Sequence, residues 1–490
     1  MSSTTQHTRL QGRLGVPGIV FLVLAAVAPL TGIIVVAGIG IAVGTGGGTP
    51  VMFLLATVVL LLFAVGYAQM AKQLTNAGGF YAFVVRGLGR TAGLVAALIA
   101  VVGYNCFVAG AVGTSGFFTA IVLEGVFGIA TPWWLWSLVS VALVWLLTRS
   151  GIDLSAKILG VALVLEVAIL VVLDVAILVR TGYSFEAFLP EVFLTGSVGL
   201  GLLFAANAFV GFEATGLFGE EARDPKRTIP RATYIAIAFI GVFAAITTWA
   251  IVSALGVRQA GEEGLAHLAA GDLIFSVSEE YLGSALTVVM QLLLIVSLFA
   301  ALLALHNSAT RYLYALGRVG VLPRALARTR ANGSPVVAST VQLVFATAVA
   351  MAFAIAGADP ITALVASFTG IGTLGIIVLQ AIAATAIVVH FRRVRDPRWL
   401  STLVLPGLGG LGLWAITSLA FANFPALAGS DSPVVALLPW LLPAAAVVAL
   451  VVAQRLRASR PEVWDGLARD LDRVDPLQPT SAVPIVDRAA

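Results

Sequence analysis

The chain has 490 residues, of which 60% are hydrophobic and only 11% are charged. Soluble domains are about 45–50% apolar and about 25% charged, so this composition excludes a series of soluble domains and predicts a polytopic membrane protein. The net charge of +4 arises from basic residues in short segments between apolar runs, where they are topology signals. We therefore expect a lipid bilayer as the environment and no nucleic acid as a partner.

Twelve apolar stretches are long enough to cross a bilayer as helices of about 20 residues. They lie at residues 18–43, 50–71, 92–122, 132–149, 154–179, 192–219, 231–256, 282–316, 336–357, 361–389, 402–423 and 434–454. The fold class that follows is an all-α polytopic membrane protein with twelve transmembrane helices. Residues 1–17 form a polar tail, and residues 455–490 are polar with several prolines, so we expect the second tail to be mobile.

The basic residues are distributed very unevenly over the segments between spans. If both termini are cytoplasmic, only Arg180 and Arg258 of the 28 basic residues lie outside. Cytoplasmic loops of membrane proteins carry an excess of lysine and arginine. The pattern predicts a multi-pass protein of the cytoplasmic (plasma) membrane with both termini in the cytoplasm.

Two spans contain residues that are poor helix formers at their centres. The first contains Ala28-Pro29-Leu30-Thr31-Gly32, and the sixth, five spans later, contains Asn207 to Glu213 with Gly211. Paired interruptions in corresponding halves are typical of inverted-repeat transporters with a site at the midplane. The physical reason is that a broken helix exposes backbone groups, which membranes tolerate only where they line a cavity. The alternative is a proline kink and a glycine packing site.

Other apparent motifs do not indicate a different function. Gly370 to Gly375 matches G-x-G-x-x-G, but it does not follow a strand, so it indicates close helix packing rather than a dinucleotide site. The four histidines are scattered and none has the spacing of a zinc site, so we expect no metal. No nucleophile–base set is visible either, and we expect the protein not to be an enzyme.

Three segments carry a resemblance to a known family. They are residues 76–81 (NAGGFY); Gly211-Phe212-Glu213 with Glu220, Glu221, Asp224-Pro225 and Ile229-Pro230; and residues 311–318 (RYLYALGR) with Gly320 and Leu322-Pro323. The chain resembles the amino acid–polyamine–organocation transporter superfamily. The resemblance implies a LeuT-type five-plus-five inverted repeat, with halves at 18–180 and 192–389, and two further helices at 402–454.

The resemblance also assigns candidate substrate contacts in the first span. The break would present backbone donors from Thr31, Gly32 and Ile33, after Pro29, and half-helix N-termini attract anions such as a substrate carboxylate. Many amino-acid-transporting relatives carry a Gly-Ser-Gly-like run at this position. In this chain the hydroxyl of Thr31 stands in for serine.

Further candidate contacts come from three other spans. In span six, Phe209, Val210 and Gly211 wall the substrate, and the Asn207 amide hydrogen-bonds either a polar substrate group or another helix. In span three, Tyr104 and its neighbour Asn105 face different directions, so one lines the cavity and the other packs. In span ten, Ser367 touches the substrate or bonds its own helix.

Two acids at membrane depth are candidates for ion coupling, because such an acid costs about 2.5–3.5 kcal/mol to insert. Glu213 resembles the family's span-six acid; the alternative is a carboxylate bonded to freed backbone amides. Glu166 lies where some proton-coupled relatives place a lysine. It carries the proton itself, or completes a cation site with Ser297 and carbonyls of span one, or pairs with Lys157. Asp174, nearer the outer end, is expected to be a wetted interfacial residue.

The function that follows is secondary active transport of an amino acid or related small amine, driven by protons. No cofactor is expected beyond a coupling ion, H⁺ or Na⁺. The alternatives are a polyamine or amine carrier, an exchanger that needs no ion and, less consistent with the residues, a membrane-embedded enzyme. The oligomeric state is left open.

Overall fold

The computed structural model describes residues 15–73, 79–150, 156–213, 215, 222–330, 334–428 and 433–472. Within these ranges the chain forms helices joined by turns, and no extended strand occurs. Residues 76–78 of the NAGGFY motif, Glu220 and Glu221 lie outside the described residues, as do the chain ends at 1–14 and 473–490.

Ten helical stretches of the described chain are long and apolar enough to cross a membrane, so the protein is a multi-pass membrane protein. The first, Val16–Ala71, contains several helices. The other nine correspond to α6 (Arg90–Phe127), α7 (Trp133–Ser150), α8 (Ala156–Arg180), α12 (Pro225–Leu255), α15 (Ser284–Val319), α16 (Val336–Ile355), α17 (Ala366–Arg393), α18 (Leu405–Asn423) and α20 (Leu441–Ser459). A shorter apolar helix, α10 (Val198–Asn207), is added to these.

The first stretch is interrupted close to its middle. Helix α1 (Val16–Val27) ends at Ala28, whose φ of 54° is left-handed, and α2 (Pro29–Thr31) follows. Proline has no N–H to donate and disfavours helical geometry in the residue before it, which explains a break at this position. The chain continues through η1 (Gly32–Ala37), α3 (Gly38–Gly40) and η2 (Ile41–Thr45), and then forms α4 (Thr49–Ala71).

The helix α10 ends at Asn207 and is followed by turns rather than by more helix. Gly211 in these turns has a φ of 115°, a conformation that side-chain-bearing residues rarely adopt. Both interruptions expected from the sequence are therefore present in the backbone.

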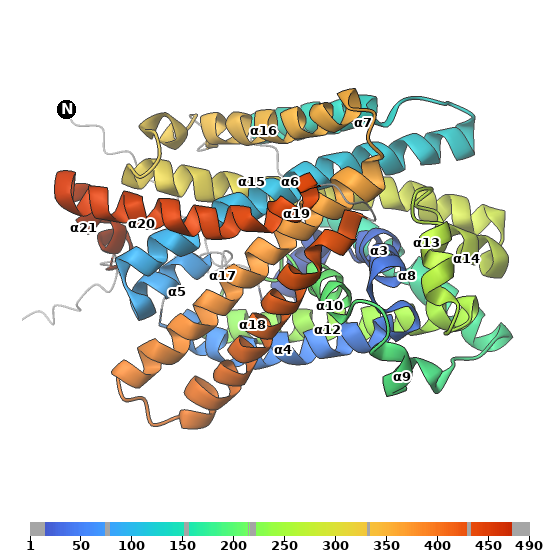
Figure 1. Ribbon diagram of the computed structural model, residues 1–490, viewed down its shortest axis with the longest axis horizontal. Coiled ribbons are helices and arrows are strands. Elements are labelled where there is room, and N and C mark those ends of the chain that lie inside the picture. The colour runs from blue at the N-terminus through green and yellow to red at the C-terminus, as the bar shows by residue number, and fades with distance from the viewer. Residues whose placement is uncertain are drawn as a thin grey trace, which may run out of the picture.

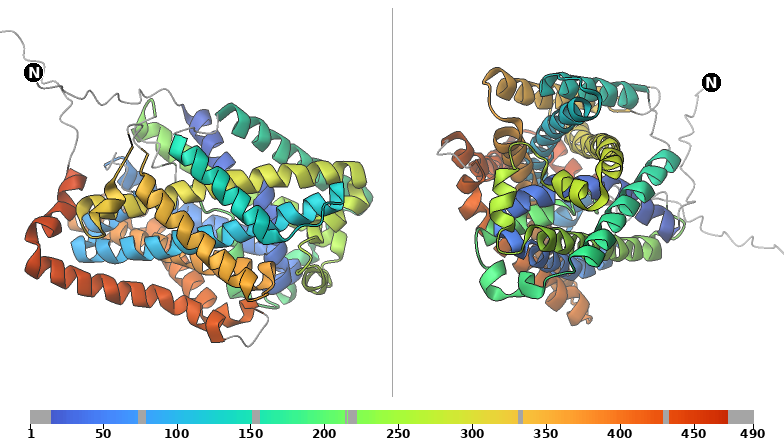
Figure 2. Two further views of the ribbon diagram at one scale, coloured as in Figure 1. Left: turned by 90° about the horizontal axis from the view of Figure 1, so that it is seen from above. Right: turned by 90° about the vertical axis from the view of Figure 1, so that its right-hand side faces the viewer.

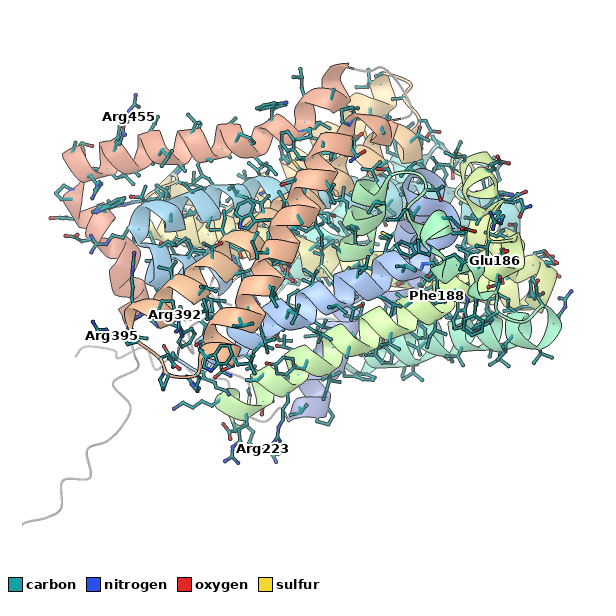
Figure 3. The ribbon with its side chains drawn as sticks, turned by 60° about the horizontal axis from the view of Figure 1, so that its bottom comes forward. Glu186, Phe188, Arg223, Arg392, Arg395 and Arg455 are labelled. Atoms are coloured by element: carbon teal, nitrogen blue, oxygen red, sulfur yellow. The ribbon has the colours of Figure 1, made fainter. Side chains whose placement is uncertain are left out.

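Most long helices lie along a common direction, with short helices at either end (Figures 1 and 2). Helices α5 (Gly79–Leu88) and α21 (Pro461–Asp472) lie at one end; α13 (Ala260–Ala266) and α14 (Leu273–Leu282) lie at the other. Arg392, Arg395 and Arg455 extend from the first end and Glu186 from the second (Figure 3). We call these the basic end and the opposite end.

The glycine run at 370–375 serves helix packing. A Cβ added to Gly372 would lie 2.6 Å from the Cα of Phe107, and one added to Gly375 would lie 2.8 Å from the Cα of Gly103. Helices α17 and α6 therefore touch backbone to backbone, and only glycine fits at these two positions.

The expectation of a mobile tail from residue 455 is wrong for residues 455–472. Helix α20 continues to Ser459, and α21 then folds back onto the basic end. Trp464 and Leu467 of α21 are buried, and Asp465 forms a 2.7 Å ion pair with Arg90 at the start of α6. An amphipathic helix with buried aromatic and aliphatic residues gains enough apolar contact to offset the entropy of ordering, which composition alone did not reveal.

Candidate functional site

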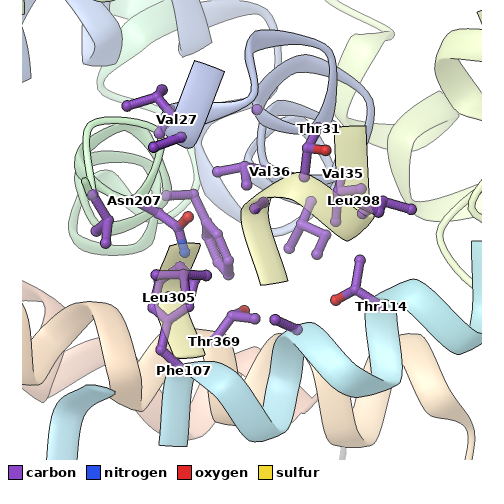
Figure 4. Close-up of a pocket in the computed structure, with 18 residues that line it drawn as sticks. Val27, Thr31, Val35, Val36, Phe107, Thr114, Asn207, Leu298, Leu305 and Thr369 are labelled. Atoms are coloured by element: carbon purple, nitrogen blue, oxygen red, sulfur yellow. The ribbon is translucent and has the colours of Figure 1, made fainter. Parts of the chain in front are cut away.

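A cavity lies between the two backbone interruptions (Figure 4). It encloses about 650 Å³ of atom-free space, including the part open to solvent. The first stretch contributes Thr31 and Gly32, and the end of α10 contributes Asn207, with Val210 in the turns that follow. Helices α6, α15 and α17 form the remaining wall.

Four of the candidate substrate contacts, Thr31, Gly32, Asn207 and Val210, line this cavity, and others lie near it. Pro29 and Ile33 line an adjoining apolar cavity of about 300 Å³, which Gly32 also borders. Phe209 is 1% exposed and does not line the main cavity. Gly211 and Ser367 do not line it either. The buried Ser367 hydroxyl has no hydrogen-bond partner among the described residues, so it does not bond its own helix.

Most of the apolar wall was not predicted. It includes Phe107 and Ala111 on α6, Phe204 on α10, and Leu298, Ala301 and Leu305 on α15. These residues lie in helices that are apolar on all faces, so helical periodicity does not mark the face toward the cavity.

The cavity contains no charged side chain among its lining residues, and its polar groups are few. Two lining hydroxyls bond their own helices: Thr114 donates to the Gly110 carbonyl at 2.9 Å and Thr369 to the Val365 carbonyl at 2.6 Å. Asn207 Nδ2 donates to Thr373 Oγ1 on α17 at 2.6 Å. This last bond agrees with the interhelical alternative for Asn207 and leaves its carbonyl oxygen as an acceptor.

Glu166 lies on α8, is 3% exposed, and contacts the break in the first stretch. Its Oε2 accepts hydrogen bonds from the Leu30 backbone N–H at 3.3 Å and from the Ser297 hydroxyl at 2.9 Å. Ser297 Oγ in turn accepts from the Thr31 hydroxyl at 2.9 Å and from the Thr31 N–H at 3.4 Å. The structure therefore joins Glu166, Ser297 and the span-one break. The side chain of Lys157, the alternative partner, lies outside the description.

The backbone donors at this break are already engaged. Leu30 N–H bonds Glu166, Thr31 N–H bonds Ser297, and Gly32 N–H bonds the Ala28 carbonyl at 3.0 Å. A substrate carboxylate would have to displace at least one of these acceptors.

Glu213 lies in the turns after α10 and is tied to α6. One carboxylate oxygen accepts a short hydrogen bond from the Tyr104 hydroxyl, and the other accepts from the Gly211 N–H at 3.0 Å. The ring of Tyr104 stacks on Tyr312 of α15, with centroids 5.2 Å apart. Tyr104 therefore bonds Glu213 instead of lining the cavity, and Asn105 Nδ2 bonds the Val101 carbonyl of its own helix at 2.7 Å.

This group of aromatic and acidic side chains lies between the cavity and the basic end. On α6, Tyr104 precedes the lining residue Phe107 and is closer to Arg90 of the basic end; on α15, Tyr312 follows the lining residue Leu305. The Tyr104–Glu213 bond and the ring stack thus lie on the side of the cavity toward the basic end.

A third cavity extends toward the opposite end. It has about 300 Å³ of atom-free space and shares Val35 and Ile39 with the main cavity. Gly264 of α13 and His267 border it, and His267 Nδ1 lies 2.7 Å from Asp272 Oδ1. No group of three or more metal-ligating side chains occurs in the described part of the chain.

Comparison with known proteins shows the family of the chain. The amino acid permease family matches residues 18–426, which is most of the chain. The branched-chain amino acid permease BcaP of Bacillus subtilis is 24% identical over 431 residues, covering 84% of this chain and 88% of that protein.

Two further relatives show how the names within this group vary. The lysine-specific permease LysP of Lactococcus lactis is 26% identical over 330 residues, covering 62% of this chain and 61% of that protein. A Mycobacterium bovis protein named only as an uncharacterized transporter, Mb2022c, is 29% identical over 389 residues, covering 78% of this chain and 80% of its own. The two interrupted helices around one cavity and the match over residues 18–426 lead to one assignment: the chain belongs to the amino acid permease family.

Proposed function

We propose that this permease is a proton-coupled secondary active transporter that carries one small amino acid through alternating access around the main cavity. The observation that carries the proposal is the meeting of both backbone interruptions at that cavity, with Glu166 bonded to the first of them. Interrupted helices at the membrane midplane supply the partial charges that an amino acid's carboxylate and ammonium groups require.

The proposed topology has twelve spans. Val16–Ala71 crosses the membrane twice, turning at Gly46–Gly48, and α10 is the outer half of a broken sixth span. The basic end faces the cytoplasm of the plasma membrane, as the positive-inside rule requires. Spans one to five and six to ten then form the two inverted repeats, and the helices at 402–454 are additional.

The cavity wall favours a substrate with an apolar side chain. Its lining contains no charged side chain, and most of its surface is aliphatic or aromatic. A polyamine or a lysine side chain would be buried there without a partner, which is costly. Among the relatives, the name of the branched-chain permease fits this wall better than that of the lysine permease.

Glu166 is the proposed proton carrier. An ionised carboxylate accepts hydrogen bonds about twice as strongly as a neutral one. Protonation would therefore weaken its hold on Leu30 and Ser297 and make the Leu30 and Thr31 N–H groups available to the substrate carboxylate. Proton binding and substrate binding would then support each other. Sodium is the alternative ion, held by Glu166, Ser297 and backbone carbonyls.

The energy of one proton is sufficient for concentrative uptake. A proton brings about 1.4 kcal/mol per pH unit and about 2.3 kcal/mol per 100 mV. One pH unit and 100 mV together support roughly 500-fold accumulation at equilibrium.

Two measurements test the substrate class. In a thermal-shift panel in detergent, leucine, isoleucine and valine should raise the unfolding temperature, because a ligand present at 100 times its Kd stabilises by about 2.7 kcal/mol. Putrescine and lysine should have no effect. Stabilisation by amines, but by no amino acid, would overturn the proposal.

Proteoliposome uptake tests the mode of transport. Labelled leucine should accumulate when an inward proton gradient is imposed and should not respond to a sodium gradient. An ion-independent exchanger would instead show counterflow but no accumulation under either gradient.

A further inference from the structure

A second buried acid lies on α8, eight residues beyond Glu166 and toward the opposite end. Asp174 was expected to be wetted, but it is only 6% exposed. Its side chain contacts α12, and its backbone contacts the segment at 181–188. The Tyr183 hydroxyl of that segment donates to the Asp174 backbone carbonyl at 2.9 Å. The sequence did not indicate that Asp174 is buried, because the segment at 181–188 that covers it lies beyond the end of α8.

The carboxyl group of Asp174 has only one hydrogen-bond partner. Thr247 of α12 donates its hydroxyl to Oδ2 at 2.8 Å. The other oxygen, Oδ1, is buried and has no partner among the described residues. Half of the carboxyl group is therefore left without solvation or a hydrogen bond.

The basic residues expected on this side are engaged elsewhere. Arg180, at the end of α8, donates to the Glu280 carbonyl at 2.6 Å and lies over the ring of Tyr281 at 4.6 Å. Arg258 pairs with Glu191 at 3.2 Å and with Glu186 at 3.8 Å. Neither cation compensates Asp174.

The other helices that pack on α8 bring no compensating charge. Helix α14 carries Glu279, Glu280 and Tyr281, and the two acids would disfavour a second negative charge nearby. Helices α1 and α2 have no titratable side chain. The titratable side chains of α12 and α15 lie in the halves of these helices toward the basic end. Among them, Tyr234 of α12 and His306 of α15 are the farthest from the basic end.

An ionised carboxylate in this environment is strongly disfavoured, because it is desolvated with one hydroxyl donor and no cation. A neutral carboxylic acid avoids the penalty for buried charge. We propose that Asp174 is a second proton-binding site, separate from the substrate cavity, which holds a proton while α8 and α12 are in contact at the opposite end. When these helices part, the carboxyl O–H bond breaks and the proton passes to solvent water.

The consequence is a sensor of the pH on the opposite side. High pH there favours the ionised acid and hence the separated helices; low pH favours contact. The site itself does not depend on the proposed transport function, and only the transport measurement below does.

Infrared difference spectroscopy of the purified protein tests the protonation state directly. Asp174→Asn should remove one carboxylic acid C=O band at neutral pH, whereas Glu279→Gln, an exposed acid on the same side, should remove none. If Asp174→Asn fails to fold, Thr247→Val should shift that band by removing its hydrogen bond. An unchanged acid band in the folded variant tested would overturn the proposal.

The pH dependence of stability gives a second readout. If native Asp174 holds a proton as proposed, the unfolded chain releases that proton above the ordinary aspartate pKa of about 3.9. The free energy of unfolding should therefore fall as the pH rises above that value. This one group lowers the folded-to-unfolded ratio of the wild type by up to about tenfold per pH unit, and Asp174→Asn should lack that contribution. Parallel curves for wild type and variant would contradict the proposal.

Transport completes the test. Asp174→Asn should bind substrate as tightly as wild type, since it lies outside the cavity, but its uptake rate should respond less to the pH on the opposite side. An unchanged pH profile would rule out the sensing role. If the wild type binds and transports no substrate at all, the proposed function fails while the infrared measurement still decides the state of Asp174.

Discussion

Glu166 and Glu213, the two acids expected at membrane depth, bond different partners. Glu166 bonds the backbone of the first interruption through Leu30 and is joined to Thr31 through Ser297. Glu213 bonds a side chain, Tyr104, on the side of the cavity toward the basic end. We propose that the first contact serves substrate and ion binding, and that the second closes the cavity on the side toward the basic end.

The coupling role predicts the behaviour of Glu166→Gln. The amide cannot exchange a proton, so proton-driven accumulation of leucine should fall at least tenfold while counterflow persists. Accumulation and counterflow in proteoliposomes at several pH values measure this, with Glu279→Gln as the control. Full retention of the pH dependence by Glu166→Gln would exclude it as the proton carrier.

The closing role predicts the behaviour of Tyr104→Phe, which keeps the ring stack on Tyr312 and removes only the hydroxyl. Loss of one hydrogen bond to a carboxylate should cost about 1–3 kcal/mol. Cys106, the single cysteine, is 4% exposed and lies two residues away, so it should react faster with a permeant maleimide in the variant. Equal labelling rates would show that this bond does not hold the cavity closed.

Two kinds of local chemistry interrupt the helices. At the first interruption, Pro29 lacks an N–H donor and disfavours helical geometry at Ala28, whose φ is 54°. At the second, Gly211 adopts a φ of 115° that allows Glu213 to fold back onto the Gly211 N–H. Each interruption is set by residues within a few positions of it, which is why both were visible in the sequence.

Gly211→Ala tests the second interruption. An added Cβ would meet Val27 at no less than 3.5 Å, so space is adequate, and the backbone conformation is the obstacle. Such strain costs about 1–3 kcal/mol, and transport should fall with it. Gly407→Ala in α18, where an added Cβ meets nothing within 4 Å, is the matched control and should be neutral or stabilising. Equal unfolding midpoints for the two variants would contradict the strain argument.

Helix α21 is expected to detach when its anchor is removed. Trp464 is buried and lies beneath the guanidinium groups of Arg457 at 5.1 Å and Arg90 at 6.0 Å. Trp464→Ala should remove about 3–5 kcal/mol of packing from this contact. Limited trypsin digestion should then cleave after Arg469, within α21, much faster than in wild type, whereas Glu462→Gln, at an exposed position, should not change the rate. Resistance of Trp464→Ala would show that other contacts hold α21.

At the scale of the whole molecule, charge is divided between the two ends and apolar side chains cover the surface between them (Figure 3). Long exposed aliphatic faces, such as Val164, Val171 and Val175 of α8, suit contact with lipid. Under the positive-inside rule, this separation of charge predicts that the basic end faces the cytoplasm.

Single-cysteine labelling tests the orientation. In a Cys106→Ala background, Glu462→Cys should react with an impermeant maleimide only from the cytoplasmic side and Glu279→Cys only from the outside. Labelling of both from one side would refute the proposed topology.

Local properties of the chain were enough to predict its class, the positions of most of its long helices and its two interruptions. Hydropathy over about 20 residues marks a span: the stretch expected at 132–149 is α7 (Trp133–Ser150), and the one at 92–122 lies within α6 (Arg90–Phe127). Proline and glycine act on their immediate neighbours.

Contacts between distant segments required the folded molecule. The Ser297–Glu166 bond joins residues 131 apart, and the cavity face of Phe107 looks like any other apolar face in the sequence. Asp174 is buried by a neighbouring helix and a returning segment, and α21 is ordered by surfaces on α6 and α15. Burial and partnership depend on which helices meet, and hydropathy carries no information about that when every face of a helix is apolar.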